Sequence, residues 1–407
     1  MIKEPQMLNQ LIESMEIAIR ELQKWPDKEI LLFHHNDTDG LTSGAILTRT
    51  FERQQFKVKR YCLEKPYPAV LKKVFNQENK CIVFTDFAGR IAPLISDLNR
   101  GKNLTLILDH HVAEPATDPM IHNLDPDLYG LKGDRDITAS ATCYLFARTM
   151  DPDNQDLAHI AGLGAVGDGF FVDGRLVNQN REVFLEAVRQ GKMEIRENPN
   201  GEQYFIKSEA GMIPCEDLSA DLDTLGAAGY YQEGPDMGIR VCLDGMSPAS
   251  KKMVEELRVI QSKRFENQKS KLIKGELINT PHIQWFHVQN RFSPMGVKMI
   301  GAFCDVYKDT EVFDPNRYIA GFQVIPNEIP GFGRIAFDEV KISMRVSSFM
   351  ENEIRSGRCL GLDVLLPDAT ARVGGFSDAW HTLTAATTVA IGKEEQLIEE
   401  MEKILGG

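Results

Sequence analysis

The chain has 407 residues, of which 43% are hydrophobic and 26% are charged, and its formal net charge at pH 7 is −13. This length predicts two or three domains rather than one small core. The negative charge argues against broad electrostatic binding to long nucleic acid, but it is compatible with a local basic track and with a cluster of acidic metal ligands.

Neither export nor membrane insertion is predicted. The first residues lack the basic-then-apolar layout of a secretion signal, and no apolar run approaches the roughly 20 residues needed to span a bilayer. The seven cysteines are scattered singly without a CxxC pair, so neither a disulfide framework nor a zinc ribbon is indicated. We therefore expect a cytoplasmic protein without a membrane partner.

An alternation of strands and helices fills the first 190 residues. The chain opens with a predicted helix over residues 5–25, whose apolar residues have helical spacing. Short apolar or β-rich runs then predict strands at 29–34, 57–62, 81–85 and 104–108. Helices are predicted between and after these strands, at 41–54, 67–76, 138–150, 156–166 and 178–190. This rhythm predicts an α/β fold with a parallel sheet that helices cover on both faces.

The rest of the chain predicts a connector and a second mixed domain. A long polar helix over 247–274 carries eight Lys/Arg and three Glu. It is therefore either a solvated connector or a positively charged surface that binds along a phosphate backbone. Beyond it we predict strands at 283–288, 318–325 and 340–346 and an amphipathic helix at 393–405. The predicted domains are residues 1–190, a linker region at 191–275 with the long connector helix, and a smaller C-terminal α/β domain at 276–407.

Acidic and imidazole side chains follow three of the predicted strands, and one further acidic residue lies in a glycine-rich segment. The four clusters are His35, Asp37 and Asp39 after the strand at 29–34; Asp86 after 81–85; Asp109, His110 and His111 after 104–108; and Asp168 in GAVGDG. In a doubly wound sheet, ligands bind outside the carboxyl ends of the strands. Carboxylates that converge there repel each other unless a cation neutralises them.

The residue types in these clusters indicate which ions they suit. Mixed carboxylate and imidazole ligands suit Mn²⁺, Fe²⁺ or Zn²⁺, whereas all-oxygen sites suit Mg²⁺ or Ca²⁺. There are enough ligands for two ions, and two ions roughly 3.5–4 Å apart clamp the attacking and leaving oxygens of a phosphoryl displacement. Taken singly, Asp37-x-Asp39 is typical of an Asx turn and Asp86 of a helix N-cap. The four clusters together favour a metal centre.

A dinucleotide-binding pattern also occurs in this region. Residues 162–167 match GxGxxG, but they follow a helix-like run rather than a strand. We therefore interpret these glycines as positions of close helix packing around Asp168.

The four clusters resemble, in order, the four motifs of the DHH phosphoesterase superfamily, and most closely those of its archaeal RecJ-like exonuclease branch. The first motif, His-x-Asp-x-Asp-Gly, is matched by His35, Asp37, Asp39 and Gly40, and the second motif by Asp86. The third, Asp-His-His, is matched at 109–111, and the fourth, Gly-x-x-Gly-Asp, at 164–168. Residues 123–147 also resemble the family's connector between the third and fourth motifs.

The resemblance implies a cofactor and a role for each motif residue. The cofactor would be two Mn²⁺ ions, with Mg²⁺ or Co²⁺ as substitutes. Asp109 would orient His110 from outside the ligand shell and His111 would face the scissile phosphate, so these two are the implied catalytic residues Asp109 and His111. The implied metal ligands are His35 at the rim, Asp37, Asp39, Asp86, His110 and Asp168.

The C-terminal domain resembles the DHH-associated substrate-binding domain. That domain carries Gly-Gly-His followed closely by Ala-Ala-Gly, whereas this chain has Gly374-Gly375-Phe376, then His381 and Ala385-Ala386-Thr387. The expected His is therefore either replaced by Phe376 or displaced to His381. Arg317 and Arg345 are phosphate-contact candidates, with surface salt bridges as the alternative. The implied substrate-binding residues are Ser343, Arg345, Gly374, Gly375, His381 and Arg317.

The resemblance implies a Mn²⁺-dependent phosphodiesterase that hydrolyses single-stranded DNA or RNA from an end, or short oligonucleotides, by two-metal activation of water, in DNA repair or replication. A cyclic-dinucleotide phosphodiesterase is a near alternative, and the net charge favours short substrates. A different alternative is a replisome scaffold that binds the GINS complex with weak or no catalysis. The intact metal motifs speak against a scaffold, and the altered Gly-Gly-His speaks for it. A manganese pyrophosphatase is disfavoured because the C-terminal half lacks the basic motif expected of one.

Overall fold

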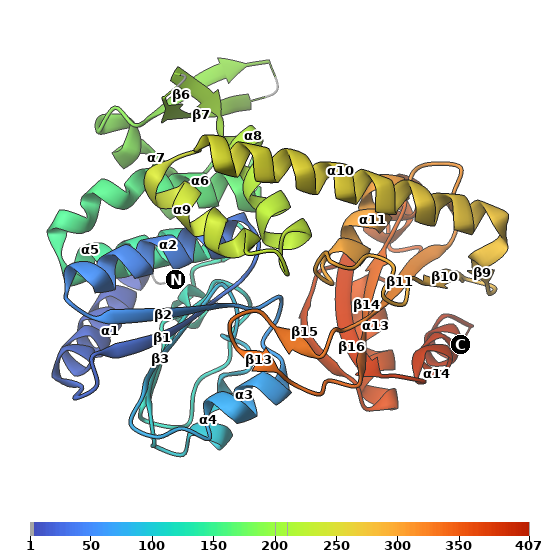
Figure 1. Cartoon of the computed structure of the whole chain (residues 1–407), viewed down its shortest axis with the longest axis horizontal. Coiled ribbons are helices and arrows are strands. Elements are labelled where there is room, and N and C mark those ends of the chain that lie inside the picture. Colours follow the sequence, from blue (N-terminus) through green and yellow to red (C-terminus); the bar gives the residue numbers. More distant parts are fainter. Residues whose placement is uncertain (1–3, 200, 210, 407) are drawn as a thin grey trace. The chain divides into compact units, whose positions relative to one another are not determined.

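The computed structural model describes residues 4–199, 201–209 and 211–406, which form two compact units (Figure 1). The first unit extends to Gly226 and resumes over Glu233–Val254, and the second comprises Ala227–Gln232 and the chain from Glu255 onward. Most of residues 191–254, which we assigned to a linker region, therefore fold with the first unit. Among the described residues, no helix combines the length and the apolar character that crossing a bilayer requires.

A five-stranded parallel sheet forms the centre of the first unit. β3 and β4 are buried throughout, as expected for strands that are covered on both faces. The first four residues of the edge strand β2 alternate between exposed and half-buried, and its last two residues are buried. The four strands predicted from the sequence are confirmed, and the three-residue β5 was not predicted. The strand order is β2-β1-β3-β4-β5, with β1 at Glu29–His34, β2 at Lys57–Cys62, β3 at Cys81–Thr85, β4 at Leu104–Leu108 and β5 at Ile121–Asn123.

Helices cover both faces of this sheet, which confirms the predicted α/β architecture (Figure 1). The β1–β2 connection runs one way along the sheet, while the connections from β2 to β3 and from β3 to β4 run the other way. Right-handed crossovers therefore place α2 on one face and α3 and α4 on the other. α5 and α6 pack against α2. The bounds are α1 Glu4–Lys24, α2 Thr38–Arg53, α3 Pro68–Val74, α4 Ala92–Asn99, α5 Ala139–Met150 and α6 Ala158–Asp168, with short 3-10 helices at Pro126–Tyr129 and Pro152–Leu157.

A smaller antiparallel sheet extends the first unit. It packs beside α7 and α8, and none of its strands was predicted, because their alternation is weak and the segment is polar. Its strands are β6 Met193–Asn198, β7 Gly201–Ser208 and β8 Gly211–Pro214; the helices around it are α7 Asn178–Arg189, α8 Cys215–Asp223, a π-helical turn at Thr224–Ala228, and α9 Gly234–Asp244.

The second unit is built on a mixed six-stranded sheet, which the helix α10 (Pro248–Lys271) and a π-helical turn (Leu272–Glu276) precede. Ile342 and its register neighbours face an apolar core with residues of α12, α13 and α14, whereas Ser343 and Gly321 face α11. The strand order is β15-β16-β14-β11-β10-β9, with β9 Ile278–Asn279, β10 Ile283–His287, β11 Tyr318–Val324, β14 Glu339–Arg345, β15 Phe376–Trp380 and β16 Thr384–Ala390. The remaining elements are α11 Met299–Tyr307, β12 Glu328–Ile329, β13 Gly333–Arg334, α12 Ser348–Arg355, α13 Leu362–Val373 and α14 Glu394–Gly406.

Candidate metal centre

The predicted metal ligands meet at the carboxyl edge of the five-stranded sheet. β1 lies between β2 and β3, so the chain leaves β1 and β3 toward opposite faces, and such a switch point is where open α/β sheets bind their ligands. The loop after β1 supplies His35 and Asp37, and the first turn of α2 supplies Asp39. The loops after β3 and β4 supply Asp86 and residues 109–111, and the last residue of α6 is Asp168.

His35, Asp37 and Asp86 form one group. Nδ1 of His35 lies 2.8 Å from Oδ2 of Asp37 and 3.3 Å from Oδ2 of Asp86. Asp37 caps α2 by accepting a hydrogen bond from the Gly40 N–H through Oδ1, so Oδ2 is the oxygen that faces this group. Asp86 has a φ of +62°, a left-handed conformation that is uncommon for a residue with a Cβ and that clusters at functional sites.

His110 is the centre of a second group. Its Nε2 lies 3.4 Å from Oδ1 of Asp86, 3.6 Å from Oδ2 of Asp168 and 3.9 Å from Oδ2 of Asp39. Nδ1 lies 3.1 Å from the carbonyl oxygen of Gly133, which only accepts hydrogen bonds, so Nδ1 carries the proton and Nε2 is the ligand atom. A Cβ at Gly133 would lie 1.5 Å from the His110 carbonyl oxygen, so this approach requires glycine.

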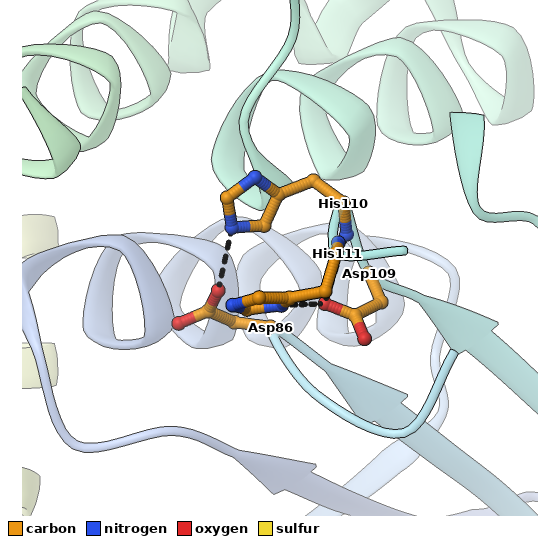
Figure 2. Close-up of side chains that lie close together, drawn as sticks. All are labelled: Asp86, Asp109, His110 and His111. Atoms are coloured by element: carbon orange, nitrogen blue, oxygen red, sulfur yellow. Dashed lines mark hydrogen bonds and ion pairs between the residues drawn. The ribbon is translucent and has the colours of Figure 1, made fainter. Parts of the chain in front are cut away.

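Asp109 and His111 form a pair beside His110 (Figure 2). Nδ1 of His111 lies 2.7 Å from Oδ1 of Asp109, and the same oxygen accepts a hydrogen bond from the His110 N–H at 2.8 Å. Oδ2 of Asp109 accepts a hydrogen bond from the Gly89 N–H at 2.8 Å. Together with the His111 N–H, which lies 3.5 Å from Oδ1, these donors fix the buried carboxylate, and Asp109 in turn orients the His111 ring and anchors the backbone at His110.

The carboxylates of this cluster compete for positive charge. Burial and the neighbouring carboxylates of Asp86 and Asp168 raise the pKa of Asp39 well above its usual value. Burial also raises the pKa of Asp168 to about 6, although His110 acts in the opposite direction. Burial opposes protonation of His110, but Asp168 and the other carboxylates raise its pKa overall. Protons or a cation must therefore balance the charge of the cluster.

The donor atoms fit a divalent cation. Oδ2 of Asp168 is buried and accepts no hydrogen bond from any described residue, so it is free to bind an ion. Imidazole and carboxylate ligands together suit Mn²⁺, Fe²⁺ or Zn²⁺. Three groups have ligand atoms within 4.8 Å of one another: His35, Asp37 and Asp86; Asp39, His110 and Asp168; and Asp86, Asp109, His110 and His111.

The N-terminus of α5 holds Asp39 in place. The N–H groups of Ala139 and Ser140 donate to Oδ2 and Oδ1 of Asp39 at 2.8 and 2.9 Å, where the helix dipole favours negative charge. α6 approaches this point closely, because a Cβ at Gly164 would lie 2.3 Å from Oγ of Ser140. The GxGxxG pattern lies inside α6, which confirms its interpretation as a helix-packing segment.

Asp223, which sequence reasoning missed, supports the loop that carries Asp37 and Asp39. Thr38 lies between these two ligands, and its N–H and its hydroxyl both donate to Oδ1 of Asp223, at 2.9 and 3.0 Å. The neighbouring Gly226 is so close to the loop that a Cβ would lie 1.7 Å from the Asn36 carbonyl oxygen. The partners Thr38 and Asp223 are 185 residues apart, so no local pattern could indicate the contact.

We expect Asp223→Ala to weaken Mn²⁺ binding by about 10-fold, the lower end of the loss typical when a group that orients metal ligands is removed. Asp223→Asn should bind Mn²⁺ nearly as tightly as the unaltered protein, because the amide oxygen still accepts from Thr38. Calorimetric Mn²⁺ titration checks both, with Asp217→Ala, an exposed residue of α8, as the matched control. Unchanged Mn²⁺ affinity in Asp223→Ala would show that the loop does not depend on this carboxylate.

Asp125 is a second buried carboxyl that the sequence did not single out. A Cβ at Gly89 would lie 2.3 Å from Oδ2 of Asp125 and 3.1 Å from Oδ2 of Asp109, so both carboxyl groups flank this glycine. Burial and the charge of Asp109 raise the pKa of Asp125 well above its usual value. An Asp directly before Pro126 is typical of an Asx turn, and Oδ1 of Asp125 accepts a hydrogen bond from the Asp127 N–H. No local pattern therefore indicated that Asp125 lies beside Asp109.

In the second unit, Ser343 and Arg345 lie together on one face of β14. A Cβ at Gly301 of α11 would lie 2.7 Å from Nη2 of Arg345 and 3.3 Å from Oγ of Ser343. Nε of Arg345 lies 2.8 Å from Oδ2 of Asp305, and Nε of Arg317 lies 3.4 Å from Oδ2 of Asp314. Both guanidinium groups thus have carboxylate partners, and their binding of phosphate stays a prediction.

Gly374 and Gly375 have backbone roles where α13 leads into β15. Gly374 ends α13 with a φ of +75°, and a Cβ at Gly375 would lie 2.5 Å from the Thr388 carbonyl oxygen of β16. His381 follows the other end of β15, where its N–H donates to the Thr384 carbonyl oxygen at 2.8 Å. The five-residue strand therefore separates His381 from the glycine pair along the chain, and the structure does not join them into one Gly-Gly-His motif.

Comparison with known proteins agrees with this fold. Residues 29–167 match the family model described as DHH family, N-terminal domain. An uncharacterized protein of Methanocaldococcus jannaschii is 22% identical, with 97% of each chain covered. Residues 29–167 are therefore similar to the N-terminal domain of the DHH family.

Two solved structures share the fold of the whole chain. Exonuclease RecJ bound to manganese superposes with a TM-score of 0.58 at 13% identity, covering 97% of this chain and 94% of the other. CDC45 from Entamoeba histolytica superposes with a TM-score of 0.57 at 10% identity, covering 97% and 99%. The fold is therefore RecJ-like, and identities this low show the fold alone.

Proposed function

We propose that the protein is a metal-dependent phosphodiesterase that uses Mn²⁺ to cleave single-stranded nucleic acid from an end, or short oligonucleotides. The observation that carries this proposal is the convergence of Asp39, Asp86, His110 and Asp168 at the carboxyl edge of one sheet. The shared fold with a RecJ exonuclease that binds manganese supports the choice of ion and of reaction. The net charge of −13 favours a short substrate over long nucleic acid.

In this proposal one ion would bind between His35, Asp37 and Asp86. The other would bind between His110 and the carboxylates of Asp39, Asp86 and Asp168. Bound ions would neutralise the charge of the phosphate and activate water. Asp109 fixes His111 with its Nδ1 proton inward, so Nε2 is the ring atom that faces the phosphate. Burial opposes protonation of His111, but the Asp109 carboxylate raises its pKa overall, which keeps it a hydrogen-bond donor to a phosphate oxygen over a wider pH range.

End-labelled DNA and RNA strands of several lengths, dinucleotides and cyclic dinucleotides, each incubated with Mn²⁺, test this proposal. We expect products that shorten stepwise from one end, and a higher kcat/KM for the short substrates. The proposal fails if the protein binds Mn²⁺ in a direct titration and cleaves none of these substrates.

A scaffold role in a replisome, with GINS as the partner, is the second candidate. The shared fold with CDC45 and the presence of Phe376 where the DHH-associated domain is expected to have His favour it. Co-purification with GINS, compared between the unaltered protein and Asp168→Asn, separates the two functions. Binding of GINS by both forms, without cleavage of any strand, would favour the scaffold.

A further inference from the structure

The loop after α6 carries a row of large apolar side chains next to the metal centre. Gly169, with a φ of +77°, ends α6 directly after Asp168, and Phe170, Phe171 and Val172 follow. The ring centroid of Phe170 lies 6.2 Å from that of the His110 imidazole. Phe170 is half-buried, and Phe171 and Val172 are each 38% exposed. Adjacent apolar side chains that reach the surface together mark a binding site more often than single ones do.

Contacts with the smaller sheet fix the shape of this loop. Phe171 stacks on Tyr204 of β7 with a centroid distance of 5.8 Å and an interplanar angle of 14°. The Tyr204 hydroxyl accepts a hydrogen bond from the Leu176 N–H at 2.7 Å, and the backbones of Val172 and Arg175 exchange hydrogen bonds at 2.9 and 3.0 Å. Phe171 and the backbone of this loop are therefore held in place before any ligand binds, which lowers the entropic cost of binding a ligand there.

Phe87, a second phenylalanine near the cluster, differs from Phe170 in its burial. The ring of Phe87 lies 6.4 Å from that of His35, but Phe87 is buried and packs on Phe84 with a centroid distance of 5.9 Å. Core packing accounts for Phe87. It does not account for Phe170, which lies two residues after Asp168, the last ligand of the cluster, and is only half-buried.

We infer that Phe170 stacks on the base of the nucleotide whose phosphate lies at the metal centre. This inference rests on the proposed function and adds to it a residue that binds the base of the substrate. Aromatic stacking tolerates every base, and it is worth roughly a 5- to 150-fold gain in affinity per base. Inorganic polyphosphate carries the same phosphate charge but no base, so its binding gains no affinity from stacking on Phe170.

The test compares the unaltered protein, Phe170→Leu and Phe170→Tyr on two strands at saturating Mn²⁺. One strand has a normal nucleotide next to the scissile phosphate and the other has an abasic nucleotide there. We expect Phe170→Leu to lower kcat/KM on the normal strand by roughly 5- to 150-fold, mainly through KM, and Phe170→Tyr to stay near the unaltered protein. On the abasic strand all three proteins should be equally slow, and their Mn²⁺ affinities should be equal.

Four results would overturn the inference. An equal loss for Phe170→Leu on both strands, or no loss on either, removes the stacking role and leaves the phosphodiesterase function standing. A weaker Mn²⁺ affinity in Phe170→Leu would mean that Phe170 acts through His110 instead. Failure of the Mn²⁺-loaded unaltered protein to cleave either strand would remove the proposed function, and this inference with it.

Discussion

Replacing Asp168 by asparagine is expected to lower Mn²⁺ affinity and Mn²⁺-dependent hydrolysis by more than the roughly 10- to 100-fold that loss of a group outside the ligand shell causes. Asp168 faces His110 at 3.6 Å and presents a buried oxygen that accepts no hydrogen bond from any described residue. An amide has the same shape but lacks the charge that a cation needs. Mn²⁺ titration and cleavage of a labelled oligonucleotide measure the two losses.

The same substitution should not destabilise the metal-free protein at neutral pH. Burial raises the pKa of Asp168 to about 6 from the usual 3.8, so between these values the folded state binds more protons than the unfolded state. The contribution of Asp168 to the free energy of unfolding is therefore fully present below about pH 4. It is lost as the pH rises through about 6, which lowers the free energy of unfolding by about 3 kcal/mol for a shift of this size. Asp168→Asn should remove this fall, and Mn²⁺ should oppose it in the unaltered protein, because the ion binds only the folded site.

Thermal unfolding between pH 4 and 8, with and without Mn²⁺, checks the stability prediction. Asp173→Asn is the matched control, because Asp173 is an exposed aspartate on the loop that follows, with a φ that asparagine also adopts. Asp168→Asn protein that binds Mn²⁺ as tightly as the control would exclude Asp168 as a metal ligand.

Asp109→Asn is expected to lower kcat by roughly 10²- to 10⁴-fold at saturating Mn²⁺, the range that proton donors and acceptors contribute. The groups that hydrogen-bond to the Asp109 oxygens are all donors: the His110 N–H, the His111 N–H, the Gly89 N–H and Nδ1 of His111. The amide NH₂ of asparagine would face one of them, which leaves a buried donor unsatisfied at a cost of about 1–3 kcal/mol.

The pH dependence separates the role of Asp109 in catalysis from its role in stability. The carboxylate raises the pKa of His111, so the protonated imidazole persists to higher pH in the unaltered protein. Asp109→Asn should move the alkaline limb of the pH–rate profile to lower pH, and His111→Gln, which cannot titrate, should abolish that limb. A limb that stays in place in both variants would assign it to another group. Asp134→Asn, at an exposed position, controls for loss of a carboxylate elsewhere.

The sequence predicted the sheet well because its strands are signalled locally. β1, β3 and β4 are continuous apolar runs, since both of their faces are buried, and their predicted bounds agree with the structure. Three of the four metal-ligand clusters directly follow such a strand, so chain order alone indicated that these three share one edge, whereas Asp168 lies at the end of α6. Short or polar elements gave no such signal, and β5 and the sheet of β6, β7 and β8 were missed.

The sequence by itself determined the α/β class, the strands of the main sheet and the set of acidic and imidazole residues at its edge, because each depends on neighbours a few positions apart. Only the tertiary structure decided that Asp223 holds Thr38, that the N-terminus of α5 holds Asp39, and that Phe170 lies beside His110. These contacts join segments that are tens to nearly two hundred residues apart. They follow from how helices pack on the sheet, and no periodicity within one segment encodes that packing.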